Sequence, residues 1–562
     1  MRGLLATPDR PASPGGGVSY RAQPFVCGAI GQVDHACLDR LRTNAPTDLI
    51  EVYRSPRAIL LATTTTGSWR SHADRGYFWG SLADGGEPTS WRSAAERRVT
   101  AGLVETPEST ILHADAAGLQ DLFTRRIDGA IYFSIRIDPL LRLDDAKLHI
   151  DWTAWASIFA FTAPVSDTTP FVEVRRMGAA SAWVADERGF HCTGFEPSWL
   201  SAEPLDHPSA AEIVAIVDAC IPSDEHRIVP LSGGWDSRLL ATLGRRHADR
   251  LVSWTTSEDD GRDRDLRLAP AVAEALGIEH HSLVPDAQAW LDELSPVRRR
   301  LDLQCTLHTW LMPLARVLHN QPGRILDGLA GDTIFKVSRF ATPELVESKD
   351  PTERHRLLWT SLGQSRFKDP SRLAPGVARE FETLSRNSLV ETVSRFDGHP
   401  AAATLDILHT RNSRSIGSMP LRLLAPEKHV DMPFLHPDVI ESALRVPHTR
   451  KQGGGFYRDM LAAAEPTVAR LPSSNDGRPT GRRGPKRQES RQALRAMAKS
   501  IRANEQVVRL LGTELRQALD DNDVLLRVGR SLGGHRQLNW ASLFAEWRTT
   551  YADVLADDDG PT

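Results

Sequence analysis

The sequence has little cysteine and no paired cysteines. Its five cysteines are scattered along 562 residues, and no two of them are separated by only two residues. This spacing excludes a zinc ribbon and a disulfide framework, and it is typical of a protein in a reducing cytoplasm.

Excess charge and long apolar runs are also lacking. The 68 Lys and Arg residues nearly balance the 72 Asp and Glu residues, for a net charge of −4 at pH 7. This balance gives no electrostatic reason to expect nucleic acid or a membrane as a partner. No run reaches the roughly 18 apolar residues that a membrane span needs, and the N-terminal apolar run is too short for a signal peptide. The expected location is therefore the cytoplasm.

The pattern along the chain predicts a tail and two domains. Residues 1–20 are rich in Pro and Gly and are expected to form a flexible tail. Residues 21–205 are expected to form a β-rich domain, because short runs of β-branched and aromatic residues recur at 24–31, 58–66, 129–137, 147–152 and 181–186. Residues 206–562 are expected to form the second domain.

The second domain begins with alternating helical and β-like segments. Helical spacing over 210–221, 237–247 and 265–277 alternates with short apolar runs at 227–234, 251–257 and 279–284. A further β-like run covers 323–332, and the pattern beyond about 340 is mostly helical. This alternation predicts an α/β fold with a doubly wound parallel sheet and a helical C-terminal portion.

The run Leu-Ser-Gly-Gly-Trp-Asp-Ser-Arg at 231–238 joins a predicted strand to a predicted helix. Gly233 and Gly234 let the backbone approach an anion closely, and the helix adds its positive N-terminal end. Ser232 and Ser237 add hydroxyl donors, and Asp236 adds an oxygen ligand for Mg²⁺. Since GxxxxGK[ST] is absent, the sequence predicts a pyrophosphate-binding loop different from a P-loop.

This loop resembles that of the ATP pyrophosphatase superfamily, and three further segments resemble its asparagine synthetase branch in the same order. They are Ser253–Thr256, Leu326–Asp332 and Pro433–Leu435, with a D…LG…HH stretch from Asp265 to His281. The resemblance covers roughly residues 210–475. It implies an enzyme that uses ATP and Mg²⁺ to activate a carboxylate as an acyl-adenylate, releases AMP and pyrophosphate, and forms an amide.

The resemblance also implies roles for individual residues. The pyrophosphate is expected to contact Ser232, Gly233, Gly234 and Ser237, and Mg²⁺ to contact Asp236 and Asp332. The remainder of the nucleotide is expected to contact Leu231, Ser253, Thr256, Asp327 and Gly328. A cation beside the departing pyrophosphate is expected among Lys336, Arg238, Lys486, Arg339 and Arg478, although the basic stretch from 478 to 502 is more typical of a solvated, partly flexible helix.

The first domain resembles the glutaminase domain of asparagine synthetase in a degenerate form. That implies an Ntn-type αββα sandwich, whose activity needs a cysteine with a free α-amine. Here residue 2 is Arg2, and Cys27, within a CGAIG run similar to the start of that domain, lies behind 26 residues. We therefore expect Cys27 to pack inside the domain, and the amine to come from a source other than glutamine.

The loop sequence and the run from Arg470 to Asp476 resemble the lasso peptide macrolactam synthetases. Such an enzyme adenylates an Asp or Glu side chain of a leader-cleaved precursor peptide, and the peptide's N-terminal amine then closes the ring. A leader peptidase and a leader-recognition protein are the partners that this resemblance implies. Leu329 stands where asparagine synthetase has Glu and β-lactam synthetase has Tyr, so the base for the amine is unassigned.

Other functions stay open at this stage. A small-molecule amide ligase related to β-lactam synthetase or asparagine synthetase is one, and a non-catalytic nucleotide- or peptide-binding subunit is another. A tRNA-modifying enzyme fits poorly, because the scattered cysteines offer no sulfur relay.

Overall fold

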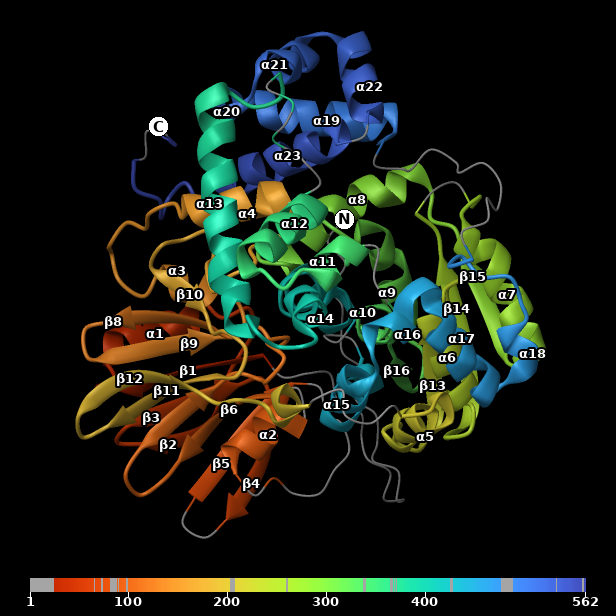
Figure 1. The fold of residues 1–562 in the computed structure, drawn as a ribbon. Helices are drawn as coiled ribbons and strands as arrows, with labels where there is room; N and C mark the ends of the chain where they lie inside the picture. The colour runs from red at the N-terminus through yellow and green to blue at the C-terminus, as the bar shows by residue number, and fades with distance from the viewer. Residues whose placement is uncertain are drawn as a thin grey trace.

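The computed structural model describes residues 25–561 except 65, 72–73, 81–87, 89, 98–99, 203–207, 259–260, 337–339, 364–366, 368, 370, 425–427, 477–488, 532 and 558–559. The predicted flexible tail, residues 1–20, lies outside the described residues. Figure 1 shows a β-rich region at the lower left, a smaller sheet at the right, and helices between and above them.

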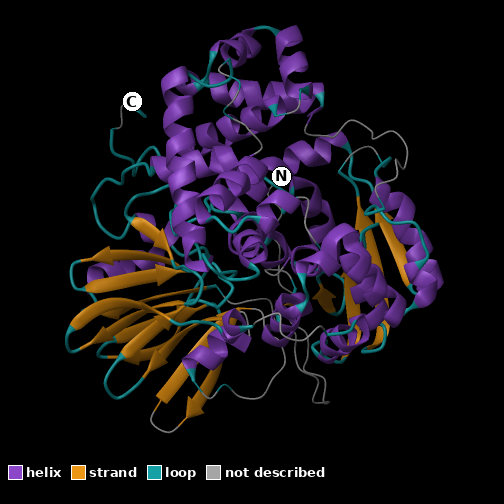
Figure 2. Cartoon of the chain, in the orientation of Figure 1, coloured by secondary structure: helices purple, strands orange, loops and turns teal. Residues whose placement is uncertain are grey.

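Two six-stranded antiparallel sheets form the β-rich region (Figure 2). The first has the order β10 (Val174–Arg176), β8 (Phe123–Ile127), β9 (Ala130–Ser134), β1 (Val26–Gly31), β3 (Ala58–Ala62), β2 (Ile50–Ser55). The second has the order β12 (Gly189–Gly194), β11 (Ser181–Asp186), β7 (Thr110–His113), β6 (Thr100–Glu105), β5 (Asp74–Gly80), β4 (Gly67–Ser71).

Alternation along the strands builds the layers of this region. In β1, Val26 and Ile30 pack between the sheets, whereas Cys27 and Ala29 face the opposite side. Helices α1 (His35–Thr43) and α3 (Asp138–Leu141) cover that outer side, and Trp91 at the start of α2 (Trp91–Arg97) packs on the outer face of the second sheet. The layers are therefore helix, sheet, sheet and helix, as the sequence predicted.

The third sheet is parallel, with the order β15 (Glu279–Leu283), β14 (Ala248–Thr256), β13 (Asp224–Pro230), β16 (Arg324–Leu326), β17 (Val430–Asp431). Helices α5 (Ala210–Ala219), α6 (Trp235–Gly244), α7 (Arg264–Leu276) and α17 (Gly455–Ala464) share a core with one face. Helices α8 (Ala287–Arg300) and α9 (Met312–His319) share a core with the other. The predicted doubly wound sheet is therefore present.

Local sequence signals set several of these helix ends. A capping box between Ser209 and Glu212 starts α5. Gly277, in the left-handed conformation with φ 64°, ends α7.

The remaining helices form the helical portion and the connections. They are α10 (Gly331–Phe335), α11 (Pro343–Glu347), α12 (Pro351–Gly363), α13 (Pro375–Val393), α14 (Ala402–Ile407), α15 (Pro437–Arg445), α16 (His448–Lys451), α18 (Pro466–Ala469), α19 (Arg491–Arg502), α20 (Glu505–Leu510), α21 (Thr513–Asp520), α22 (Asn522–Arg530) and α23 (Gly534–Thr550). Two π-helices are η4 (Leu408–Ile416) and η5 (Met419–Leu424). Short 3₁₀ segments are η1 (Ser198–Ser201), η2 (Thr309–Leu311), η3 (Ser394–Phe396), η6 (Pro433–Leu435) and η7 (Gln452–Gly454). In the described part of the chain, no helix has both the length and the apolar character needed to cross a bilayer.

The predicted strand at 147–152 is wrong. Leu148 and Ile150 make only isolated bridges, and Asp151 accepts a hydrogen bond from the Ala154 amide and caps α4 (Trp152–Phe161). This helix joins the two halves of the chain, because its Trp155 ring lies 5.2 Å from that of Trp547 in α23.

Candidate functional site

The loop at 231–234 joins β13 to α6, as predicted, and its amides are held by side chains. Ser237 Oγ accepts from the Ser232 amide at 2.9 Å, and Ser232 Oγ accepts from the Gly234 amide at 3.1 Å. Asp265 Oδ1 accepts from the Gly233 amide at 2.9 Å. In the sequence, Asp265 was recognisable only as part of a segment that resembles asparagine synthetase. In the structure its carboxyl holds the Gly233 amide and so fixes the conformation of the loop.

Asp236, in the first turn of α6, faces the turn that precedes α10. A Cβ at Gly328 would lie 2.9 Å from Asp236 Cβ, and a Cβ at Gly331 would lie 2.6 Å from Asp236 Oδ1. Only glycine leaves room for this approach. It brings the Asp236 carboxyl close to Asp332, in the first turn of α10.

The two predicted metal ligands therefore lie together. Burial and the neighbouring Asp332 carboxylate raise the pKa of Asp236, while Tyr457 and Lys336 act in the opposite direction. Asp236 Oδ1 is buried and has no hydrogen-bond partner among the described residues. An unpaired buried carboxylate oxygen beside a second carboxylate fits a cation that neutralises both.

The donor set also fits Mg²⁺ in particular. Within the described ranges, no three His, Cys, Asp or Glu side chains are grouped so as to hold a metal by themselves. Mg²⁺ is commonly held by one or two carboxylates together with phosphate oxygens of the substrate. Asp236 and Asp332 would supply the protein's share of such a site.

The predicted cations have different outcomes. Lys336 Nζ lies 5.0 Å from the centre of the Trp235 ring, beside the loop. Arg238 is completely buried and donates to the backbone oxygens of Leu471 at 3.0 Å and Pro472 at 2.8 Å. The predicted catalytic role of Arg238 is therefore corrected, because its guanidinium positions the backbone behind the loop. Lys486, Arg478 and Arg339 lie outside the described residues.

A cavity of about 270 Å³ adjoins the loop and the two carboxylates. Among the predicted nucleotide contacts, it is lined by Leu231, Ser232, Ser237, Thr256, Asp327 and Gly328. Asp327 accepts from the Leu329 amide at 2.9 Å, and burial raises its pKa to about 6. Ser253 is not among the lining residues. Its hydroxyl contacts Glu279 O at 3.0 Å and His280 Nδ1 at 2.9 Å, so its predicted nucleotide contact is corrected to a contact with β15.

Sequence reasoning missed a second part of the cavity wall. Trp254, Thr255, Trp310, Arg411, Asn412 and Met419 also line it. Thr255 Oγ1 donates to Leu231 O at 2.6 Å and fixes the start of the loop against β14. Trp254 and Thr255 lie within the Ser253–Thr256 segment, whose resemblance indicated a nucleotide contact. Nothing local marks Arg411 and Asn412, which come from η4, far along the chain.

Two further cavities lie next to this one along η4. A cavity of about 390 Å³ shares Trp310, Arg411 and Ile416 with the nucleotide-side cavity. It shares Val165 and Arg414 with a third cavity of about 1070 Å³. The three cavities are therefore neighbours, and residues of η4 line each of them.

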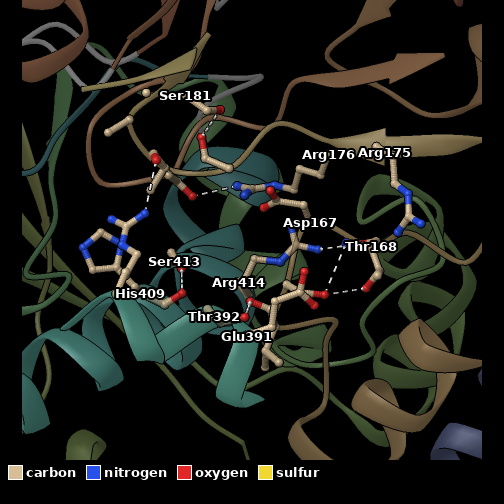
Figure 3. Close-up of a pocket in the computed structure, with 18 of the residues that line it drawn as sticks. Asp167, Thr168, Arg175, Arg176, Ser181, Glu391, Thr392, His409, Ser413 and Arg414 are labelled. Atoms are coloured by element: carbon tan, nitrogen blue, oxygen red, sulfur yellow. Dashed lines mark hydrogen bonds between the residues drawn. The ribbon is translucent and has the colours of Figure 1, made fainter. Parts of the chain in front are cut away.

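Figure 3 shows the third cavity, which lies between the β-rich region and helices α13 and η4. Asp167 and Arg175 come from the first half of the chain, and Glu391 and Arg414 from the second. Burial raises the pKa of Asp167 although four arginines oppose this shift. Acidic and basic side chains both line this third cavity. Such a lining suits a polar, extended ligand better than a simple anion.

Cys27 is fully buried in β1, as predicted. Burial raises the pKa of its thiol to about 12. A thiol in this environment is not a nucleophile at neutral pH.

Comparison with known proteins gives one extended match. The family model described as asparagine synthase matches residues 210–506. A 7-cyano-7-deazaguanine synthase from Synechococcus sp. (strain RCC307) is 39% identical over 64 residues, which cover 11% of this chain and 29% of that protein. The chain thus spans less than a third of that relative's length.

Two solved structures show weaker likeness. One is titled as the allosteric regulatory enzyme of purine biosynthesis, with 11% identity, a TM-score of 0.20, and coverage of 46% of this chain and 80% of that chain. The other is glutamine phosphoribosylpyrophosphate amidotransferase from B. subtilis, with 9% identity, a TM-score of 0.21, and coverage of 47% and 91%.

Proposed function

The chain belongs to the asparagine synthase family, and from this premise we propose that it is an ATP-dependent, amide-forming ligase that closes the macrolactam ring of a lasso peptide. The substrate is a leader-cleaved precursor peptide. An Asp or Glu side chain of the peptide is adenylated by ATP, and the peptide's N-terminal amine then displaces AMP to form an isopeptide bond.

The arrangement at the loop supports the adenylation step. Asp236 and Asp332 would hold Mg²⁺, whose charge would neutralise the departing pyrophosphate. Lys336, beside the loop, adds positive charge near the same place. The Ser232 and Ser237 hydroxyls line the cavity beside the loop and would face the pyrophosphate, and the N-terminal end of α6 would favour its negative charge.

The observation that carries the peptide proposal is the presence of three neighbouring cavities along η4. A small amino acid and ATP need one or two adjoining sites, whereas the third cavity of about 1070 Å³ extends the space to the cleft between the two halves of the chain. A peptide whose acidic side chain reaches the nucleotide requires such an extended course.

The buried Cys27 thiol supports an amine supplied by the substrate itself. Without a reactive thiol, the β-rich region has no nucleophile at this position with which to release ammonia from glutamine. Leader removal must precede ring closure, because it creates the free α-amine. A leader peptidase and a leader-recognition protein are therefore the proposed partners.

The test is a reconstitution with purified protein, ATP, Mg²⁺ and a linear peptide that has a free α-amine and an internal acidic residue. We expect AMP, pyrophosphate and a peptide product lighter by one water. The same peptide with an acetylated α-amine is the matched control, and we expect it to yield AMP but no ring.

Two other results would contradict the proposal. AMP release with aspartate and ammonia but with no peptide would indicate a small-molecule amide ligase. Absence of AMP with every carboxylate donor, together with unchanged peptide or nucleotide binding in Asp236→Ala, would indicate a non-catalytic binding subunit.

A further inference from the structure

Asn412 is a buried amide in the wall of the nucleotide-side cavity. It lies in the middle of the π-helix η4 and is 1% exposed. π-Helical segments are uncommon and occur frequently at functional sites. The Oδ1 atom of Asn412 has no hydrogen-bond partner among the described residues, although a buried polar atom normally has one.

A chain of hydrogen bonds fixes which atom of the amide is left over. Thr333 Oγ1 donates to Asp332 Oδ1 at 3.3 Å, so its only proton is used. Asn412 Nδ2 lies 2.9 Å from Thr333 Oγ1 and must therefore be the donor of that pair. This places Asn412 Oδ1 as an acceptor without a donor, two hydrogen bonds away from a predicted metal ligand.

Leu329, in the wall of the same cavity, indicates what the free acceptor of Asn412 could do. Leu329 lines the same cavity and has neither a proton to give nor a lone pair to accept one. The amine that attacks the adenylate therefore finds no titratable group at that position. Asn412 reaches the same cavity from a different element of the fold.

We propose that Asn412 Oδ1 accepts a hydrogen bond from the attacking α-amine and directs its lone pair to the activated carbonyl carbon. The inference rests on the proposed function, and it assigns the group that orients the nucleophile. The amide oxygen is uncharged, so it binds an N–H without the full negative charge that would hold the amine in its ammonium form. An α-amine has a pKa of about 7.7–8.0, so a large share is neutral near pH 8.

The step balances without a further reactant. The nitrogen lone pair forms the C–N bond, and the C–O bond to AMP breaks with its electron pair left on the phosphate oxygen. The surplus proton on nitrogen passes to solvent water. Asn412 neither gains nor loses a proton, and its contribution is orientation at the moment of attack.

The test compares Asn412→Ala and Asn412→Leu with the unaltered protein in the reconstitution above. The readout is macrolactam formed per AMP released, which does not depend on how fast the adenylate forms. We expect this ratio to fall about tenfold in both variants, the effect of losing one hydrogen bond to the reacting group. Hydroxylamine, which reaches the adenylate without guidance, should trap it equally well in every variant.

Thr333→Ser is the matched control, because it keeps the hydroxyl that accepts from Asn412 Nδ2 and so keeps Asn412 Oδ1 in place. We expect it to retain the original ratio even if AMP release slows. Ser418→Ala, outside the cavities, should match the unaltered protein in ratio and rate, and thermal unfolding establishes which variants are folded.

An unchanged ratio in a folded Asn412 variant would overturn the inference. So would an equal fall in Thr333→Ser, since this variant keeps the hydroxyl that holds the Asn412 amide. Failure of the unaltered protein to release AMP with any peptide would instead refute the proposed function, so the two failures are distinguishable.

Discussion

Gly331→Ala should separate the metal-binding geometry from the stability of the fold. The new methyl carbon would lie 2.6 Å from Asp236 Oδ1 and 2.7 Å from the Phe434 ring. These distances are shorter than any normal contact of a Cβ atom. Because the Phe434 ring is packed in the core against Phe335, we expect the Asp236 carboxyl to be the group that moves.

Two opposing terms set the stability change. Gly331 lies in α10 and its φ is not positive, so alanine is favoured there by about 1 kcal/mol from helix propensity. Overpacking in a filled site costs about 1–3 kcal/mol. We therefore expect a net destabilisation of about 0–2 kcal/mol. A displacement of a catalytic group by about 1 Å costs roughly 100-fold in rate, so activity should fall far more than stability.

The assay is peptide-dependent exchange of labelled pyrophosphate into ATP, measured beside denaturant unfolding. Gly455→Ala is the matched control, because a Cβ at Gly455 meets nothing within 4 Å and the residue is likewise in the first turn of a helix. We expect exchange in Gly455→Ala at the original rate. Full exchange in Gly331→Ala would refute the view that Asp236 must keep its place beside Asp332.

Three further predictions concern other buried groups. Arg238→Ala should lower the free energy of unfolding by about 2–4 kcal/mol in denaturant titrations, because the backbone oxygens of Leu471 and Pro472 lose their charged donor. A change below about 0.5 kcal/mol would contradict the role of Arg238 in positioning the backbone. Cys27→Ala should retain pyrophosphate exchange and ring closure. In the native protein the Cys27 thiol should resist iodoacetamide at pH 8, because burial raises its pKa to about 12. Rapid modification of Cys27 in the folded protein, located by peptide mapping, would refute the expected protection. Burial lowers the pKa of Lys451 to about 7, so between pH 7 and 10 the unfolded chain binds more protons than the folded one. The free energy of unfolding should therefore rise with pH in this range, by at most about 1.4 kcal/mol per pH unit. Lys451→Met should lack this rise, and an identical pH dependence of stability in both proteins would contradict the prediction.

The contiguous parts of the site were predictable from the sequence. The run from Ser232 to Ser237 contains its own turn and places the predicted metal ligand Asp236 in the first turn of α6, so a local pattern was sufficient. The turn at 327–332 was recognised in the same way. The structure then explains its spacing, because Gly328 and Gly331 are needed where α10 approaches Asp236.

Other features were hidden because they depend on partners far along the chain. Ser253 and Thr255 share one side of a buried strand, and only the neighbouring strands decide that Ser253 bonds β15 whereas Thr255 bonds the loop. Asn412 gives no sequence signal, since its role depends on contact with Thr333. Helix α4 was missed because eight of its ten residues are buried, so it shows no polar face from which a helical period is recognised.

The packing of α4 also explains why a β-rich region with a buried thiol remains part of this ligase. Phe159 of α4 lies 5.4 Å from the Phe381 ring in α13, and α13 supplies Glu391 to the cavity of Figure 3. The segment that follows α4 supplies Asp167 to the opposite wall. Removing the β-rich region would therefore expose the apolar faces of α13 and α23 and remove one wall of this cavity. On the proposed function, the loss of this wall would let more water reach an acyl-adenylate and hydrolyse it, so the region would support the reaction even without chemistry of its own.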